Sequence, residues 1–272
     1  AKRWLNIGIF SFQPSEITKV GLIIFYSAWL TKNKDKLKSI KEGFFMPLAL
    51  FVPVVLIVVL LQNHFSATLV MGLLLVILMV LSGCKIKYFV FIGLPLALLG
   101  VAGLFALGQG FRMQRVLTFF DPWKDASGSG WQIIQSLYAI GSGGLFGVGL
   151  GDSKQKYLYI PEPHNDFIFA VLAEELGFIG CAIVIILFAI LIWRGITISM
   201  KAPDMFGSLL AAGITSMIAI QVIINIAVVT SSMPVTGMAL PFFSYGGTAL
   251  IINLIAIGIL LSVSRAGNKT DI

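Results

Sequence analysis

Seven long apolar runs restrict how this sequence can fold more than any other feature. Each is long enough to cross the hydrocarbon core of a bilayer, which takes about 20 helical residues. Backbone amide and carbonyl groups find no water in that core, so each run is expected to form a helix that satisfies its own hydrogen bonds. The sequence therefore predicts an all-α, polytopic transmembrane bundle with spans near 15–31, 45–61, 65–82, 88–108, 166–193, 206–229 and 239–263.

The composition excludes a soluble globular domain. Apolar residues make up 58% of the chain and charged residues 11%, whereas roughly a quarter of the residues in a soluble domain are charged. A net charge of +7 would suggest nucleic acid binding in a soluble protein, but in a membrane protein the position of the charges matters, and no nucleic-acid partner is predicted. Cys84 and Cys181 lack the spacing of a metal site or a disulfide framework, so both are predicted to be inert.

Lysine and arginine residues sort the short loops into two faces. Cytoplasmic loops are enriched in these residues, and the loop 32–42 holds five lysines. Alternation of the spans puts the loops 83–87 and 194–204 on the same face, and both carry Lys or Arg. The C-terminal tail falls on that face as well and also carries Lys and Arg. The short internal loops on the opposite face carry neither: 62–64 and 230–238. The sequence therefore predicts that residues 32–42 face the cytoplasm.

The same alternation puts the long segment 110–165 on the outer side, where it forms a large extracytoplasmic loop. The loop and the spans are predicted to form a single transmembrane domain over residues 1–272. Its semi-apolar part, 130–151, is expected to include a short helix at the membrane surface. Six of the eleven residues from Gly141 to Gly151 are glycine. No strand precedes this run and no Lys-Ser/Thr pair follows it, so a phosphate-binding P-loop is disfavoured. A tight loop whose backbone packs closely against membrane helices is the preferred interpretation.

Charged residues near or inside membrane spans are costly and mark candidate functional sites. Glu16 and Lys19 lie at the outer end of the first span, and their i, i+3 spacing puts them on one helical face. They either form an intrahelical pair at the interface, with Lys19 extended towards water, or take part in chemistry.

The segment PEPHNDFIFAVLAEELGFIG (161–180) is the richest in polar groups. Asp166 lies where the fifth span begins, and it either caps that helix or acts in catalysis. Glu174 and Glu175 lie about 12–14 Å deeper along the helix, where carboxylates need buried partners or protonation. They either act in chemistry or lock helices together.

Further candidates lie on the outer side. Basic residues there oppose the charge bias of the topology, which points to an anionic ligand that Arg is well shaped to bind; lipid headgroups are the alternative. These residues are Arg3, Arg112, Arg115, Lys124, Lys154 and Lys156. Near the start of the last span, Ser244 and Tyr245 either line a cavity or pack against neighbouring helices.

Five motifs that contain these candidates resemble the SEDS family of FtsW, RodA and SpoVE. They occur in family order and cover essentially the whole chain: RWLNIGIFSFQPSE, RVLTFFDPW, SGWQIIQSLYAIGSGGLFGVGLGDSKQK, PEPHNDFIFAVLAEELGFIG and PVTGMALPFFSYGGTAL. The sequences of these motifs are most similar to those of the FtsW/SpoVE branch of Gram-positive bacteria. Family members have ten spans and the RW motif follows the third, so the resemblance implies that this chain corresponds to the last seven of ten.

The resemblance also implies an activity. Members polymerise lipid II, the undecaprenyl-pyrophosphate disaccharide-pentapeptide, into glycan strands at the outer face of the bacterial plasma membrane. They are inverting glycosyltransferases that work with a class B penicillin-binding protein, alongside divisome or sporulation proteins in division or spore cortex synthesis. By resemblance Asp166 is the essential aspartate and Lys19 its partner. The predicted substrate-binding residues are Arg3, Glu16, Arg115, Lys154, Lys156, Ser244 and Tyr245.

Two other functions stay open at this level, a lipid II flippase and a non-catalytic scaffold for the penicillin-binding protein. A flippase needs polar residues through the full depth of the membrane, whereas a glycosyltransferase needs a carboxylate near cations at the outer face. No metal site or certain cofactor is predicted, and the sequence leaves open whether a divalent cation takes part.

Overall fold

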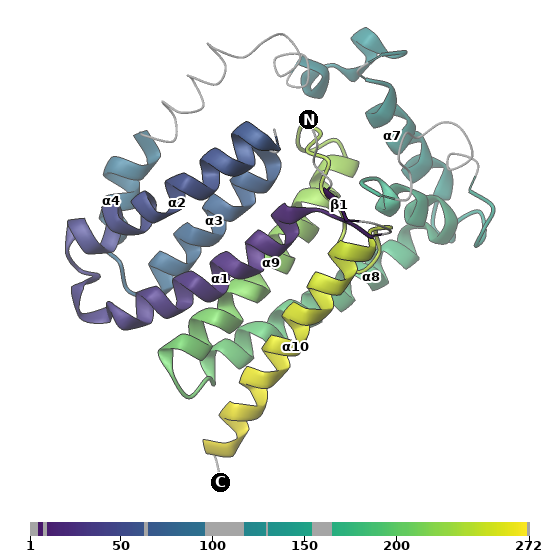
Figure 1. Ribbon diagram of the computed structural model, residues 1–272. Coiled ribbons are helices and arrows are strands. Elements are labelled where there is room, and N and C mark those ends of the chain that lie inside the picture. Colours follow the sequence, from purple (N-terminus) through teal and green to yellow (C-terminus); the bar gives the residue numbers. More distant parts are fainter. Residues whose placement is uncertain are drawn as a thin grey trace. The chain divides into compact units, whose positions relative to one another are not determined.

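The computed structural model describes residues 5–7, 10–62, 65–95, 117–128, 130–153 and 165–270, most of which are helical (Figure 1). The chain divides into two compact units. One comprises Ala1–Leu96, Leu191–Ile220 and Gly247–Ile272, and the other Ala97–Ile190 and Gln221–Gly246.

Long apolar helices dominate the described residues. Four are long and apolar enough to cross a membrane: Lys41–Val59, Ile168–Met200, Met205–Val229 and Gly247–Gly267. Phe65–Leu81 is a shorter apolar helix. The predicted all-α, polytopic class is therefore confirmed, whereas the number of seven spans stays a prediction.

Most helix boundaries fall close to the predicted runs. Four helices match them within a few residues, apart from a longer C-terminal extension of α8: α1 (Pro14–Lys32), α3 (Phe65–Leu81), α8 (Ile168–Met200) and α9 (Met205–Val229). The second run forms α2 (Met46–Leu56) between π-helical segments at Lys41–Phe45 and Ile57–Leu61. Pro53 lies inside α2 and lacks the amide that a regular helix needs, which fits the altered hydrogen bonding one turn later. The fourth run begins as α4 (Ile86–Tyr88) and continues as the π-helical segment Phe89–Gly93, and its part beyond Pro95 lies outside the described residues.

The predicted start of the last span at residue 239 is wrong. α10 covers Gly247–Thr270, so eight predicted helical residues are irregular. Gly237 and Phe242 have φ angles of 67° and 68°, in the left-handed region that a helix cannot contain. Pro241 removes a further helical hydrogen bond. Leu240 and Pro241 are buried in this irregular segment whereas Phe243 is exposed, so its apolar character does not mark a span.

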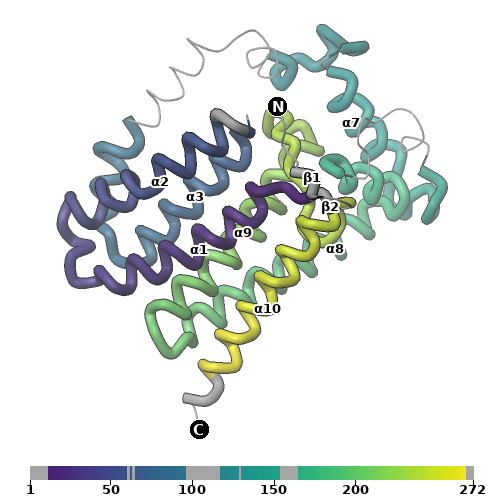
Figure 2. The backbone as a smooth tube through the Cα atoms, viewed as in Figure 1, coloured from purple at the N-terminus to yellow at the C-terminus, as the bar shows by residue number. Residues whose placement is uncertain are grey.

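A short antiparallel hairpin precedes α1, and the sequence analysis does not predict it. Strand β1 (Leu5–Ile7) pairs with β2 (Phe10–Phe12) in the register Leu5↔Phe12, Asn6↔Ser11 and Ile7↔Phe10. Strand β2 contacts α10, and Figure 2 shows α1, which follows the hairpin, beside that same helix. Pro14 then fits the first turn of α1, where a missing amide costs nothing.

The first unit packs around α1, which contacts both α3 and α10. Its buried side chains recur every three or four residues and include Lys19, Ile23, Tyr26 and Leu30. The Tyr26 hydroxyl donates to the carbonyl of Pro47 at 3.0 Å and so ties α1 to α2. Lys19 is therefore part of a helix whose inner face is fixed by packing.

The second unit contains the short helix predicted within 130–151, here α7 (Trp131–Gly143). One face of α7 is buried through Ile133, Ile134 and Ala139. The buried hydroxyl of Ser136 donates to the carbonyl of Val229, the last residue of α9, at 2.7 Å. A side chain of α7 thus fixes this helix to the end of a membrane helix.

Candidate functional site

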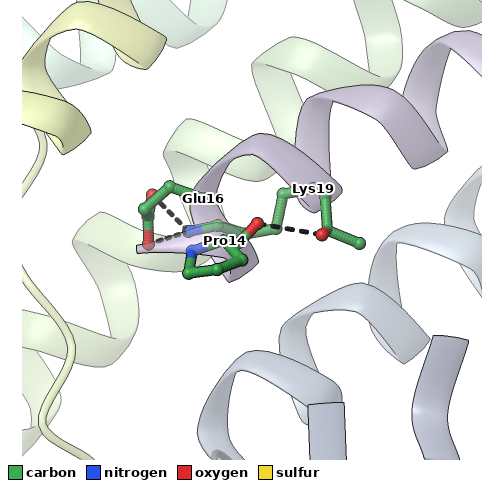
Figure 3. Close-up of polar contacts among 4 residues, drawn as sticks. Pro14, Glu16 and Lys19 are labelled. Atoms are coloured by element: carbon green, nitrogen blue, oxygen red, sulfur yellow. Dashed lines mark hydrogen bonds and ion pairs between the residues drawn. The ribbon is translucent and has the colours of Figure 1, made fainter. Parts of the chain in front are cut away.

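Glu16 and Lys19 form the ion pair that their spacing predicts (Figure 3). The Lys19 ammonium lies 2.8 Å from both carboxylate oxygens of Glu16. The Lys19 side chain is only 2% exposed and that of Glu16 15%. The expected extension of Lys19 towards water is therefore wrong, because packing of α1 encloses the side chain. The first turn is also held by Thr18, whose hydroxyl donates to the carbonyl of Pro14 at 2.9 Å.

Asp166 is half-buried in a turn directly before α8. The helix begins at Ile168, and the carbonyl of Phe167 accepts its first backbone bonds, from Ala170 at 2.9 Å and Val171 at 3.4 Å. By position Phe167 is therefore the N-cap residue, and Asp166 precedes it. The predicted place of Asp166, at the start of this helix, is confirmed.

Two polar side chains hold the backbone of this turn from distant parts of the sequence. The Asn225 amide donates to the carbonyl of Asp166 at 2.8 Å and to that of Met238 at 2.7 Å. The Ser244 hydroxyl donates to the carbonyl of Asn165 at 2.6 Å. Consecutive carbonyls before α8 are thus bound by α9 and by the irregular segment before α10. This fixes the backbone from which the Asp166 carboxylate extends.

Ser244 also accepts a hydrogen bond from the Leu240 amide at 2.7 Å. Its single hydroxyl hydrogen is used within the chain, so Ser244 packs and positions. Tyr245, by contrast, is 84% exposed.

Helix α8 is broken at Gly177, where φ is +66°. The backbone groups that the break releases are bound by the glycine-rich loop that follows α7. Four hydrogen bonds do this: from Val148 to Glu174 at 2.9 Å, from Gly149 to Glu175 at 3.1 Å, from Phe178 to Gly144 at 2.9 Å and from Ile179 to Leu145 at 3.2 Å. A broken helix in a membrane requires such partners.

The glycines permit this close approach. A Cβ atom at Gly143 would collide with the carbonyl of Ala173, and one at Gly147 with that of Glu175. The prediction of a tight loop packed by its backbone against a membrane helix is therefore confirmed.

Glu174 is 2% exposed and accepts a hydrogen bond of 2.5 Å from the buried hydroxyl of Ser153. Its side chain thus joins the end of the loop to the same part of α8 that the backbone bonds hold. Of the two interpretations for Glu174, these contacts favour the locking of elements.

The remaining predicted substrate-binding residues lie outside the described part of the chain: Arg3, Arg115, Lys154 and Lys156. Asn225 was missed from the sequence. Its position inside an apolar run could have identified it as a candidate, because a polar residue there is costly unless it has a buried partner. Among the described residues, no group of three or more His, Cys, Asp or Glu side chains is placed to hold a metal ion.

Comparison with known proteins gives one consistent result. The family model for FtsW, RodA and SpoVE, described as a cell cycle protein, matches residues 1–269. Stage V sporulation protein E of Bacillus subtilis (strain 168) is 48% identical over 97% of this chain and 72% of its own length. A probable peptidoglycan glycosyltransferase FtsW of Geobacter sp. (strain M18) is 44% identical over 97% of this chain and 71% of its own.

Solved structures resemble this chain as well. A chain from a structure on the coordination of polymerization and crosslinking by a peptidoglycan synthase complex is 30% identical, with a TM-score of 0.80 over 97% of this chain and 73% of its own. The crystal structure of rod shape determining protein RodA of Thermus thermophilus is 29% identical, with a TM-score of 0.64 over 97% of this chain and 69% of its own. The chain therefore belongs to the FtsW/RodA/SpoVE family and is a multi-pass protein of the bacterial plasma membrane.

Proposed function

We propose that this protein is an inverting peptidoglycan glycosyltransferase that polymerises lipid II at the outer face of the plasma membrane, in cell division or sporulation. Relatives named as peptidoglycan glycosyltransferases and as a sporulation protein support the activity and its setting. The observation that carries the proposal is the turn at Asp166, whose backbone is bound by Asn225 and Ser244.

The reaction sets the requirements of the site. A sugar hydroxyl of the acceptor attacks the anomeric carbon of the donor, so a carbon–oxygen bond forms there while the bond to the lipid pyrophosphate breaks. The pyrophosphate leaves with the bonding electron pair, and the hydroxyl proton passes to a base. A single displacement inverts the anomeric centre. The site therefore needs one positioned carboxylate and positive charge near the leaving group.

Asp166 is the proposed base. Rigid placement suits this role, because a general base must lie within hydrogen-bond reach of the proton that it removes. Asn225 donates to the carbonyl of Asp166 and Ser244 to that of the preceding Asn165, and together they restrict the position of the Asp166 Cα atom, as the precision of such a site demands.

The other proposed roles follow the family motifs. Lys19 is the proposed partner of Asp166, with Glu16 beside it, and Tyr245 is a proposed contact for substrate. The proposed cations for the pyrophosphate are Arg3, Arg115, Lys154 and Lys156. Ser244 is reassigned from substrate contact to positioning, because its hydroxyl hydrogen is used on Asn165.

The proposed partner is a class B penicillin-binding protein that cross-links the new glycan. The solved peptidoglycan synthase complex couples polymerization with crosslinking, and a chain of it superposes on this protein with a TM-score of 0.80. Divisome or sporulation proteins would supply the cellular context.

The decisive experiment compares Asp166→Asn with wild type in the full-length protein, reconstituted with its penicillin-binding partner and labelled lipid II. The substitution keeps the shape of the side chain but removes the base, so glycan synthesis on gels should fall about a hundredfold or more. Asp152→Asn is the matched control, since Asp152 is an exposed carboxylate of the same unit. Wild-type polymerisation by Asp166→Asn, with unchanged thermal stability, would leave Asp166 with a structural role only.

The outer location of the loop 110–165, within one membrane domain, is part of the same proposal. In a background without native cysteines, a cysteine at Ala126 should react with an impermeant maleimide in intact cells. One at Lys36 should react only after permeabilisation. The opposite pattern would put the proposed site on the wrong side of the membrane for glycan synthesis.

A further inference from the structure

A small cationic pocket lies between the C-terminal parts of α8 and α10, both within the first unit. Its volume is about 70 Å³, and Arg194, Thr197 and Lys201 line it from one side and Val263, Ser264 and Gly267 from the other. One ordered water needs roughly 10–15 Å³ of such space, so the pocket accepts a group of several heavy atoms.

Neither cation of the pocket is neutralised within the described residues. Arg194 and Lys201 form no salt bridge there. The nearest acidic residue in the sequence is Asp204, and its carboxylate accepts a hydrogen bond from the Gly207 amide at 3.1 Å at the start of α9. Two positive charges therefore face one small space without a countercharge from these elements.

The pocket also offers hydroxyl groups. Ser264 forms no hydrogen bond among the described residues, so its hydrogen is available to a ligand. The Thr197 hydroxyl donates to the carbonyl of Trp193 at 2.9 Å and is already used. Gly267 allows α10 to approach this end of α8, because a Cβ atom there would lie 2.7 Å from the carbonyl oxygen of Lys201. An anion would therefore meet two cations and a free donor.

The depth of the pocket relative to the membrane indicates which class of anion it would bind. The part of α8 that follows the break at Gly177, residues 178–200, would extend for about 35 Å as a helix, whereas the hydrocarbon core is about 30 Å thick, so its C-terminal end reaches the headgroup region. Trp193, beside Arg194, is 67% exposed, and tryptophan is enriched at the membrane interface. The Lys and Arg distribution predicts that this end faces the cytoplasm, where anionic headgroups attract basic residues.

We propose that Arg194, Lys201 and Ser264 bind the phosphate of an anionic phospholipid headgroup from the cytoplasmic leaflet. The guanidinium of Arg194 matches two phosphate oxygens, and Lys201 adds a point charge. This site is separate from the proposed chemistry at Asp166 and does not depend on it.

Native mass spectrometry of the full-length protein, released from nanodiscs of phosphatidylglycerol and phosphatidylcholine, tests this proposal. The double variant Arg194→Gln/Lys201→Gln should lose retained phosphatidylglycerol by about 25-fold, at roughly fivefold per cation near an anionic surface. The matched control is Lys85→Gln/Arg265→Gln, which removes two exposed cations of the same unit that do not line the pocket. It should retain most of the bound lipid.

Two further arms complete the test. Ser264→Glu introduces a carboxylate into the pocket and should weaken lipid retention while thermal stability in detergent stays unchanged. Excess inorganic phosphate should not displace the lipid, since the acyl chains hold it in the membrane. Equal losses in the double variant and its control, or displacement of the lipid by phosphate alone, would overturn the proposal.

Discussion

The side-chain amide of Asn225 donates to the main-chain carbonyl of Asp166 at 2.8 Å, across 59 positions of sequence. Asn225 is 1% exposed, and its second hydrogen bond reaches Met238. One buried residue of α9 therefore connects the turn of the proposed base to the segment before α10.

Asn225→Leu should lower the rate of polymerisation more than it lowers substrate affinity. The variant removes both donors, and a displacement of about 1 Å in a catalytic group can cost roughly a hundredfold in rate. Steady-state kinetics with labelled lipid II should show a reduced kcat and a nearly unchanged KM. Gln221→Leu is the control, since Gln221 is buried one turn earlier on α9 and forms no hydrogen bond among the described residues. Equal kinetic effects of the two variants would contradict a positioning role for Asn225.

Ser244→Ala should act in the same direction as Asn225→Leu but less strongly. It removes one donor to Asn165 and one acceptor for Leu240, and unsatisfied buried groups cost about 1–3 kcal/mol each. The temperature of thermal unfolding and kcat should both fall. Tyr245→Ala, one residue further along, should leave stability unchanged because Tyr245 is 84% exposed. A raised KM in that variant would support its proposed contact with substrate, and unchanged kinetics would remove it.

Gly177→Ala should destabilise the protein strongly. The residue has a φ of +66°, and an added Cβ atom would collide with the amide nitrogen of Gly147. Backbone strain alone costs about 1–3 kcal/mol, and the collision would also displace the loop that binds the broken helix. Thermal unfolding in detergent measures the effect. Gly258→Ala is the control, because a Cβ atom there meets nothing within 4 Å, and this helical substitution should be neutral or slightly stabilising.

The sequence predicted the elements that a period or a charge pattern specifies. Most apolar runs became helices, the spacing of Glu16 and Lys19 produced their ion pair, and the glycine-rich loop packed by its backbone as expected. These features depend on local geometry, which residue spacing encodes directly.

What the sequence did not predict depends on contacts between distant segments. The hydrogen bond from Asn225 to Asp166 joins α9 to the turn before α8, which is distant in sequence, and the residues around either position do not identify the partner. The start of the last helix was misplaced for a different reason. Apolar residues around Phe242 satisfied a hydropathy criterion, whereas the positive φ of that residue and the nearby Pro241 exclude a helix.

Cys84 should react slowly with maleimides, in agreement with its predicted inertness. Burial raises the pKa of its thiol, and the Ser82 hydroxyl, 3.7 Å from the sulfur, opposes that shift only in part. Because the thiolate is the reactive form, the onset of labelling should move to higher pH. Gel shifts with a polymer-linked maleimide can be compared with Cys84→Ser/Lys85→Cys, which moves the thiol to the exposed neighbouring position, in a Cys181→Ser background. Equal labelling at pH 8 would contradict the effect of burial.

Glu16→Gln should destabilise the fold more than Lys19→Met. Removal of the carboxylate takes from the 2% exposed ammonium the one ion-pair partner that it has among the described residues, and an uncompensated buried charge costs up to about 3–5 kcal/mol. Removal of the ammonium leaves a carboxylate that is 15% exposed and can gain water. The double variant Glu16→Gln/Lys19→Met should recover much of the stability lost by Glu16→Gln. Thermal unfolding of all three variants gives the comparison.

The same variants separate the structural role of Lys19 from its proposed role beside Asp166. If Lys19 orients the base, Lys19→Met should remain folded but lose polymerisation, and Lys19→Arg should restore part of it because the positive charge is kept. The Glu16→Gln/Lys19→Met variant should stay inactive even where its stability recovers. Polymerisation at the wild-type rate by stable Lys19→Met would restrict Lys19 to the ion pair with Glu16, since a positioning residue cannot be removed without a loss in kcat.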